Sequence, residues 1–333
     1  MENKPGRVFI TDCEGPITKN DNAAELAEAF IPGGDRFFRK ISLYDDYLAE
    51  VVKKRGYKAG DTLRLILPFF KAFGLDNRSM GKFSRRSIEL IPQADCMLQQ
   101  VSDVMPTYIV STSYSSYIKS VCEVIEFPFM NTYSTVVDLD RYPLSEAENK
   151  ALKDLHARIL ALPDFLIPSV GGSLDDLSGA DKQALQDLDE IFWGILPGMR
   201  IFRIIEDVNP IGGREKARAI EQIMELEDAS LHDVIYVGDS ITDVDAFRMV
   251  KSGGGLAVSF NGNDWAVKEA AYAVTAQNAL PIGWVAMMFL NRGLAGFDDL
   301  TVSPVNEQTV ERISRESSRI RKSVRTEKIG TLG

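Results

Sequence analysis

The chain has 333 residues, of which 45% are hydrophobic and 26% charged, and its formal net charge is −10. These values are typical of a globular protein with one or two domains and a sizeable core. The negative charge argues against nucleic acid and anionic membranes as main partners, because both select clustered cations.

The N-terminal part of the chain predicts one strand followed by helices. The opening sequence MENKPGRVFI lacks the apolar stretch of a signal peptide, so we expect a cytoplasmic protein. Val8–Asp12 is a short apolar run typical of a buried strand with functional residues at its C-terminal end. A helix is predicted over 21–30, and between 35 and 91 apolar residues recur at spacings of three and four. We interpret this stretch as a helical insertion.

The rest of the chain returns to strands that alternate with helices. A helix is predicted over 213–225, and 145–162 and 181–193 predict helices of a second insertion. This alternation favours an α/β fold with a doubly wound parallel sheet, in which the C-terminal ends of the strands meet at one edge. Short β-prone runs predict further strands at 107–111, 135–139, 234–237, 256–258 and 273–275.

The last segment, 308–328, is polar and locally basic. We interpret it as a solvated surface helix or a frayed end, with a helix that docks a protein partner as the alternative. The predicted organisation of the whole chain is core at 1–20, helical cap at 21–92, core at 93–138, second helical insertion at 139–199, core at 200–295 and C-terminal tail at 296–333.

A pair of carboxylates follows the first predicted strand, in Asp12-Cys13-Glu14-Gly15. In a loop just past a strand the two groups can converge, so that one could bind a metal and attack a substrate while the other moves protons. Gly15 lets the chain turn where a side chain would obstruct it. Taken alone, the pair is explained equally well as helix caps.

Two further features suit a phosphoryl group. Ser111 and Thr112 follow the second predicted strand, where hydroxyls and backbone N–H groups can bind phosphate oxygens; the alternative is the cap of a helix that begins near Tyr114. Lys216 lies in the first turn of a predicted helix and opposes the helix dipole, so it is expected to gain a contact elsewhere, such as a phosphate or an aspartate. An exposed lysine is the alternative.

A second pair of carboxylates, Asp239 and Asp243, lies four residues apart after the predicted strand at 234–237. Hard oxygen ligands that converge on a small site suit Mg²⁺. Asp243 could instead only cap the following helix.

Taken in order, the carboxylate pair, the hydroxyl, the lysine and the second carboxylate pair resemble the four motifs of phosphatases of the haloacid dehalogenase (HAD) superfamily. The resemblance covers roughly residues 5–20, 93–138 and 200–290. It implies a Rossmann-like core with a helical cap of the C1 type in the first gap between motifs. The chain also resembles archaeal HAD-like proteins labelled energy-converting hydrogenase A subunit R.

The resemblance also implies roles for the motif residues. Asp12 is the nucleophile, and Glu14 is the acid–base group in place of the commoner aspartate. Ser111, Thr112 and Lys216 bind phosphate, and the Mg²⁺ site is formed by Asp12, Glu14, Asp239 and Asp243, with Glu14 contributing its backbone carbonyl. The implied activity is hydrolysis of a small phosphorylated metabolite, without a nucleic-acid or membrane partner; a protein could dock on the basic tail. Alternatives are a phosphotransferase and a non-catalytic or assembly protein on a HAD scaffold.

Overall fold

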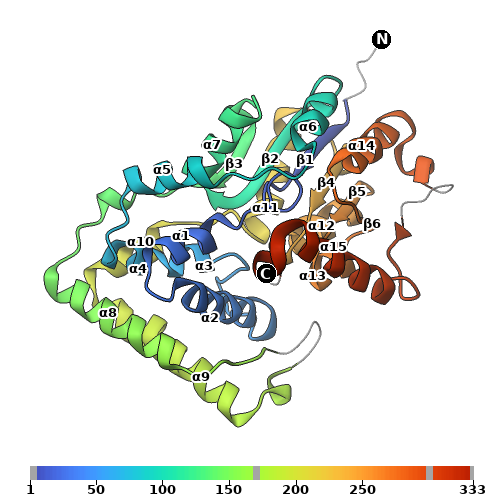
Figure 1. The fold of residues 1–333 in the computed structure, drawn as a ribbon. Helices are drawn as coiled ribbons and strands as arrows, with labels where there is room; N and C mark the ends of the chain where they lie inside the picture. The colour runs from blue at the N-terminus through green and yellow to red at the C-terminus, as the bar shows by residue number, and fades with distance from the viewer. Residues whose placement is uncertain (1–5, 168–172, 298–302, 331–333) are drawn as a thin grey trace.

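The computed structural model describes residues 6–167, 173–297 and 303–330. A seven-stranded sheet in the order β3-β2-β1-β4-β5-β6-β7 forms its centre (Figure 1). Strands β1 to β6 pair in parallel, and β7 is antiparallel to β6. The predicted doubly wound α/β fold is therefore confirmed. The strands are β1 (Val8–Thr11), β2 (Thr107–Tyr114), β3 (Thr132–Thr135), β4 (Val234–Gly238), β5 (Leu256–Phe260), β6 (Tyr272–Val274) and β7 (Ser303–Pro304).

Two strand predictions need correction. The strand expected at 135–139 ends at Thr135, and the next residue, Val136, is 74% exposed. The apolar residues past Thr135 therefore lie beyond the sheet, and β3 uses the more polar residues before them. The two-residue strand β7 was not predicted, because Ser303 and Pro304 carry no strand-like pattern of their own.

Helices cover both faces of the sheet, which explains why all four residues of β1 are buried. Phe9 points to an apolar cluster on one face, and Val8 and Ile10 point to a cluster on the other. The first face is covered by α6 (Ala94–Ser102), α7 (Ser115–Val124) and α14 (Leu280–Arg292), and the second by α11 (Arg214–Leu226), α12 (Val244–Ser252) and α13 (Asp264–Glu269).

The two helical stretches outside the sheet pack on each other through one apolar cluster. The Phe69 ring lies 4.9 Å from the ring of Phe37 and 6.2 Å from that of Phe192, between ring centroids. Figure 1 shows α8 and α9 on the outer side of α2, away from the sheet. The helices are α1 (Asn22–Phe30), α2 (Gly34–Asp46), α3 (Thr62–Leu65), α4 (Leu67–Ala72) and α5 (Asn77–Ser87), then α8 (Glu146–Ala161), α9 (Gly179–Asp189) and α10 (Arg203–Asp207).

The C-terminal segment forms a long helix, α15 (Val310–Gly330). The predicted helix is present, but the interpretation as a solvated or frayed end is wrong for one of its faces. Ser317, Arg321 and Arg325 are all buried. The physical reason is that this face meets buried polar groups of the core, described below. Within the described residues, none of the helices combines the length and the apolar character needed to cross a bilayer.

Candidate active site

The loop after β1 holds the expected nucleophile. The backbone N–H of Asp12 donates to the carbonyl of Val237 on β4, 2.8 Å away, so the strand pair fixes the position of the residue. Gly15 has a φ of 106°, and a Cβ at this position would lie 2.1 Å from Oδ2 of Asp239. The expected turn at glycine is therefore also a close approach between two of the predicted motifs.

Lys216 lies in the first turn of α11 and is completely buried. Its Nζ lies 2.6 Å from Oδ2 of Asp12 and 2.7 Å from Oδ1 of Asp243. The alternative of an exposed lysine is therefore wrong. Burial lowers the pKa of Lys216, but the charges of Asp12 and Asp243 raise it further, so the net pKa lies above its usual value and the side chain stays a cation.

Asp243 holds this part of the site together. Its Oδ1 also accepts a hydrogen bond from the Tyr236 hydroxyl, at 2.6 Å, and its Oδ2 accepts from the backbone N–H of Asp239 and of Ser240, at 2.9 and 3.0 Å. Asp243 therefore caps the short turn that begins at Ile241, whereas it makes no side-chain capping bond to the following helix α12. Its expected role as a metal ligand stays a prediction. Tyr236 carried no signal in the sequence.

Three carboxylates could share a metal ion. Oxygens of Asp12, Asp239 and Asp243 all lie within 4.8 Å of one another, and all three residues are buried. Burial raises the pKa of Asp12 to about 7, although Lys216 lowers it. Oxygen donors of this kind fit Mg²⁺. All three carboxylates already have partners: Asp12 pairs with Lys216 and accepts from the backbone N–H of Cys13, and Asp239 is engaged by α15, as described below. A bound ion would share these oxygens or displace a partner.

The hydroxyl residues lie inside a strand instead of after it. β2 continues to Tyr114, although its pairing with β1 ends at Ile109. Ser111 and Thr112 therefore extend past the neighbouring strand end and line the same cavity as Asp12. Tyr114 is the N-cap residue of α7 and makes no side-chain capping bond, so the alternative of a serine or threonine cap is wrong.

The second carboxyl of the first loop, Glu14, turns toward the start of α1. Its Oε1 accepts a hydrogen bond from the backbone N–H of Asn22 at 2.7 Å. Burial is the main cause that raises the pKa of Glu14 well above its usual value, and the charge of Asp21 adds to it, while the Asn22 N–H and Arg325 lower it. A raised pKa favours the protonated carboxyl, the form that a proton donor needs.

Asp12, Glu14, Ser111, Thr112 and Asp239 line one cavity of about 100 Å³, and Lys216 and Asp243 lie behind its lining. The first helical stretch contributes part of its lining, including Asp45, Asp46 and Gly60. None of its lining residues comes from 139–199, so within the described part of the chain the second stretch packs behind the first and away from the cavity.

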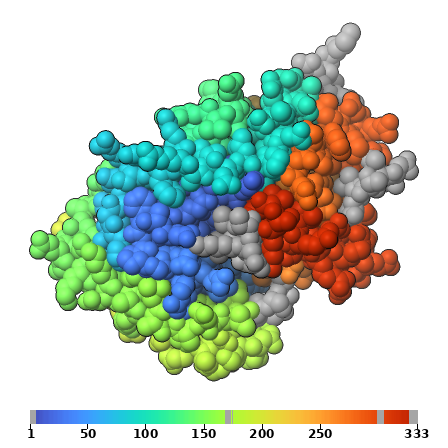
Figure 2. All heavy atoms as spheres, in the orientation of Figure 1, coloured from blue at the N-terminus to red at the C-terminus, as the bar shows by residue number. Residues whose placement is uncertain are grey.

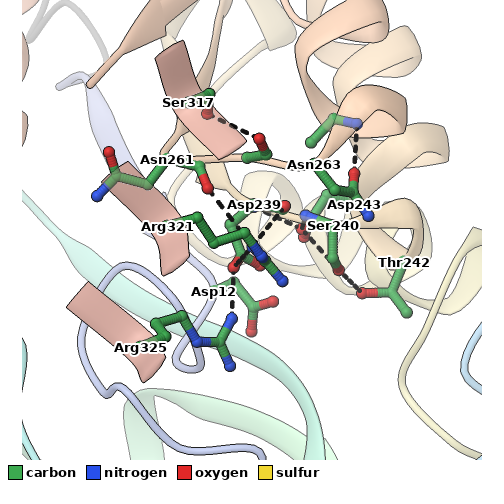
Figure 3. A network of polar contacts seen from close by, with 12 residues as sticks. Asp12, Asp239, Ser240, Thr242, Asp243, Asn261, Asn263, Ser317, Arg321 and Arg325 are labelled. Carbon is green, nitrogen blue, oxygen red and sulfur yellow. Dashed lines mark hydrogen bonds and ion pairs between the residues drawn. The ribbon is translucent and has the colours of Figure 1, made fainter. Parts of the chain in front are cut away.

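Sequence reasoning missed two residues of the site, Arg321 and Arg325 of α15. Figure 3 shows both side chains pointing at Asp239. Nη1 of Arg325 lies 2.7 Å from Oδ2 of Asp239, and Nη1 of Arg321 pairs with the same oxygen. Ile313, Ser317, Arg321 and Arg325 recur every four residues, which places them on one helix face. That spacing was the available signal, but it does not say what the face contacts.

Comparison with known proteins identifies solved structures of similar fold. No family model matches, and no curated protein matches. The structure of gene product AF1437 from Archaeoglobus fulgidus superposes with a TM-score of 0.86 and 28% identity, covering 98% of this chain and 99% of that one. Two structures of phosphoserine phosphatase, one with a phospho-aspartyl intermediate analogue and one with substrate bound, each give a TM-score of 0.50 and 14% identity, covering 84% of this chain and 98% of theirs.

These neighbours confirm the HAD-like fold that the four motifs predicted. At 14% identity the phosphatase structures show only that the fold is similar. The name of AF1437 states no activity. The resemblance to the hydrogenase-associated archaeal group stays a prediction.

Proposed function

We propose that the protein is a Mg²⁺-dependent phosphatase that hydrolyses a small phosphorylated metabolite through an aspartyl-phosphate on Asp12. The observation that carries this proposal is the ion pair between the buried Lys216 and Asp12. Asp12 lines a cavity together with Glu14, Ser111 and Asp239. A phosphoryl group needs a nucleophile, a proton donor and fixed positive or hydrogen-bonding groups, and these are the residue types that converge here. The small cavity supports a small substrate.

The chain's own residues account for both chemical steps. An oxygen of Asp12 forms a bond to phosphorus as the bond to the leaving oxygen breaks, and Glu14 gives its proton to that oxygen. Water then attacks the phosphorus, Glu14 takes a proton from it, and the bond between Asp12 and phosphorus breaks. Ser111 and Lys216 hold the transferring oxygens.

The carboxylate cluster fits a divalent cation held by Asp12 and Asp239. We propose the backbone carbonyl of Glu14 as a further donor. Bound Mg²⁺ would neutralise charge between the substrate phosphate and the carboxylate nucleophile. Asp243 would act on the site through Lys216 and the loop that carries Asp239, since it already contacts both.

One observation favours a second candidate, a non-catalytic or assembly protein on a HAD scaffold. Asp239, a proposed metal ligand, is engaged by two arginines of α15. A protein that had lost catalysis could keep such a contact as a purely structural ion pair.

A panel of phosphomonoesters, with and without Mg²⁺, separates the two candidates. We expect hydrolysis by the purified full chain that depends on Mg²⁺ and that Asp12→Asn lowers by at least about 10⁴-fold, because the nucleophile is lost. Asp95→Asn changes an exposed aspartate on α6 and is the matched control. Acid-quenched protein should carry phosphate on the peptide that contains Asp12.

Absence of hydrolysis across the panel, or full activity of Asp12→Asn, would contradict the phosphatase proposal. Transfer of the phosphoryl group to an added alcohol in excess of hydrolysis would instead identify a phosphotransferase that uses the same nucleophile.

A further inference from the structure

Helix α15 closes the cavity with two cations. Arg321 and Arg325 are only 3% and 5% exposed, and they are the only basic residues among those that line the described cavity. The same lining contains six acidic residues, namely Asp12, Glu14, Asp21, Asp45, Asp46 and Asp239. The two guanidinium groups are therefore the only cations among the residues that line this acidic cavity in the described part of the chain.

Both arginines act on one carboxylate. Arg321 and Arg325 share Oδ2 of Asp239, and Arg321 also donates to the Asp239 backbone carbonyl at 3.1 Å (Figure 3). Asp239 belongs to the carboxylate cluster that can hold a divalent cation. Two guanidinium groups carry the same positive charge as one Mg²⁺ ion. The helix therefore neutralises this carboxylate in the way that a bound cation would.

The arginines also tie α15 to the nucleophile loop. Nε of Arg325 donates to the carbonyl of Lys19 at 2.9 Å, and its Nη2 donates to the carbonyl of Asn20. In Figure 2 the helix lies on the surface directly beside the N-terminal part of the chain. The contact therefore joins the helix to the loop that starts at Asp12.

Among the described residues, other groups also hold the helix, including Val324, which packs against the apolar cluster on the first face of the sheet. The hydroxyl of Ser317 donates to the carbonyl of Gly262 at 2.7 Å, and Ile313 packs in a small apolar cluster with Val267 and Ala273. The exposed face carries charged residues such as Arg319 and Lys322. Because the ion pairs with Asp239 are among the docking contacts, a competitor for this carboxylate would weaken the docking of the helix.

We propose that α15 and a divalent cation compete for Asp239, so that Arg321 and Arg325 hold the site closed and cation binding releases the helix. The inference rests on the proposed use of the carboxylate cluster by a metal ion. Arg321 and Arg325 thereby set the affinity of the site for the cation. By thermodynamic linkage the effect is reciprocal: the docked helix weakens cation binding, and the bound cation weakens docking.

Two measurements on the full chain test this competition. Calorimetric titration with Mg²⁺ compares the wild type with Arg321→Gln/Arg325→Gln and with the control Arg319→Gln/Lys322→Gln, which removes the same charge from the exposed face. We expect the dissociation constant to fall roughly 5- to 150-fold in the first variant, the usual range for coupled sites, and to stay unchanged in the control.

The second measurement needs no substitution and decides the matter if a variant folds poorly. Amide hydrogen exchange of the wild type is followed in α15 over 313–325, with α8, which lies far from α15 (Figure 1), as internal reference. We expect Mg²⁺ to speed exchange in α15 and to leave α8 unchanged.

Either readout can overturn the proposal. Equal Mg²⁺ affinity in the two double variants would show that the buried arginines do not oppose the cation. Unchanged exchange of α15 would show that any gain in affinity reflects charge alone. Both results leave the proposed phosphatase standing if Mg²⁺ still binds, whereas failure of every variant to bind Mg²⁺ would overturn the competition and also contradict the proposed metal dependence.

Discussion

Two groups of buried cations face different carboxylates of one cluster, and they come from different parts of the chain. Lys216 opens a helix of the core and pairs with Asp12 and Asp243, whereas Arg321 and Arg325 reach Asp239 from the C-terminal helix. The lysine is enclosed by the core and has only these carboxylates to neutralise. The arginines lie on a helix at the surface of the molecule, so their contact can open while the core stays folded. Lys216 is therefore the fixed cation of the site, whereas Arg321 and Arg325 can leave it together with α15.

The largest effect is expected from removing the fixed cation. Lys216→Met leaves Asp12 and Asp243 buried without their cation, which should lower the free energy of unfolding by about 3–5 kcal/mol. Urea denaturation followed by circular dichroism measures this loss. Lys82→Met, which changes an exposed lysine on α5, is the control. A loss no greater than that of the control would break the distinction between the two cation groups.

The next effect concerns Glu14, which lines the same cavity as Arg321 and Arg325. Glu14→Gln keeps the shape but cannot exchange a proton, so we expect a loss in the rate of alkyl phosphate hydrolysis of about 10²–10⁴-fold. The first step should suffer less with p-nitrophenyl phosphate, because nitrophenolate leaves without a proton. Single-turnover kinetics on both substrates checks this. Equal first-step losses would argue against Glu14 as the proton donor, and Glu14→Asp should recover part of the rate.

A smaller effect is expected in the docking of α15. Ser317→Ala removes the hydrogen bond to the carbonyl of Gly262 and should destabilise the docked helix by about 1 kcal/mol. Faster hydrogen exchange in α15, with no change in α12, is the expected readout. Ser323→Ala alters an exposed serine of the same helix and should leave exchange across the rest of the helix unaffected. Uniform loss of protection in the whole protein would mean that α15 is part of the core.

The smallest effect is expected for an ion pair at the surface. Arg85 pairs with Glu123, and their side chains are 66% and 45% exposed. Arg85→Gln should cost at most about 1 kcal/mol in the free energy of unfolding, because water and salt screen the pair. Thermal or urea denaturation at low and high salt measures it. If Arg85→Gln lowered the free energy of unfolding about as much as Lys216→Met, burial would not explain why the ion pairs of the site contribute more than exposed ones.

Most residues of the site could be predicted from the sequence. Asp12, Ser111 and Lys216 were found because each lies next to an apolar strand or at a helix start, and parallel strands bring their C-terminal ends to one edge. The paired Asp239 and Asp243 were found for the same reason. The different contacts of Asp239 and Asp243 were not predictable, because they depend on the fold, which brings Oδ1 of Asp243 against Lys216 and Tyr236.

The sequence by itself determined the α/β fold, the loops that carry chemistry and the residues expected in them, since these follow from local patterns of apolar and polar residues. Tertiary structure alone decided that the second helical stretch packs behind the first, through Phe69 and Phe192. It also decided that α15 reaches the site. Pairing of β7 with β6 and the packing of Ile313 turn the helix back onto the core. The direction of a helix after a short strand is fixed by such long-range contacts, and no local pattern encodes them.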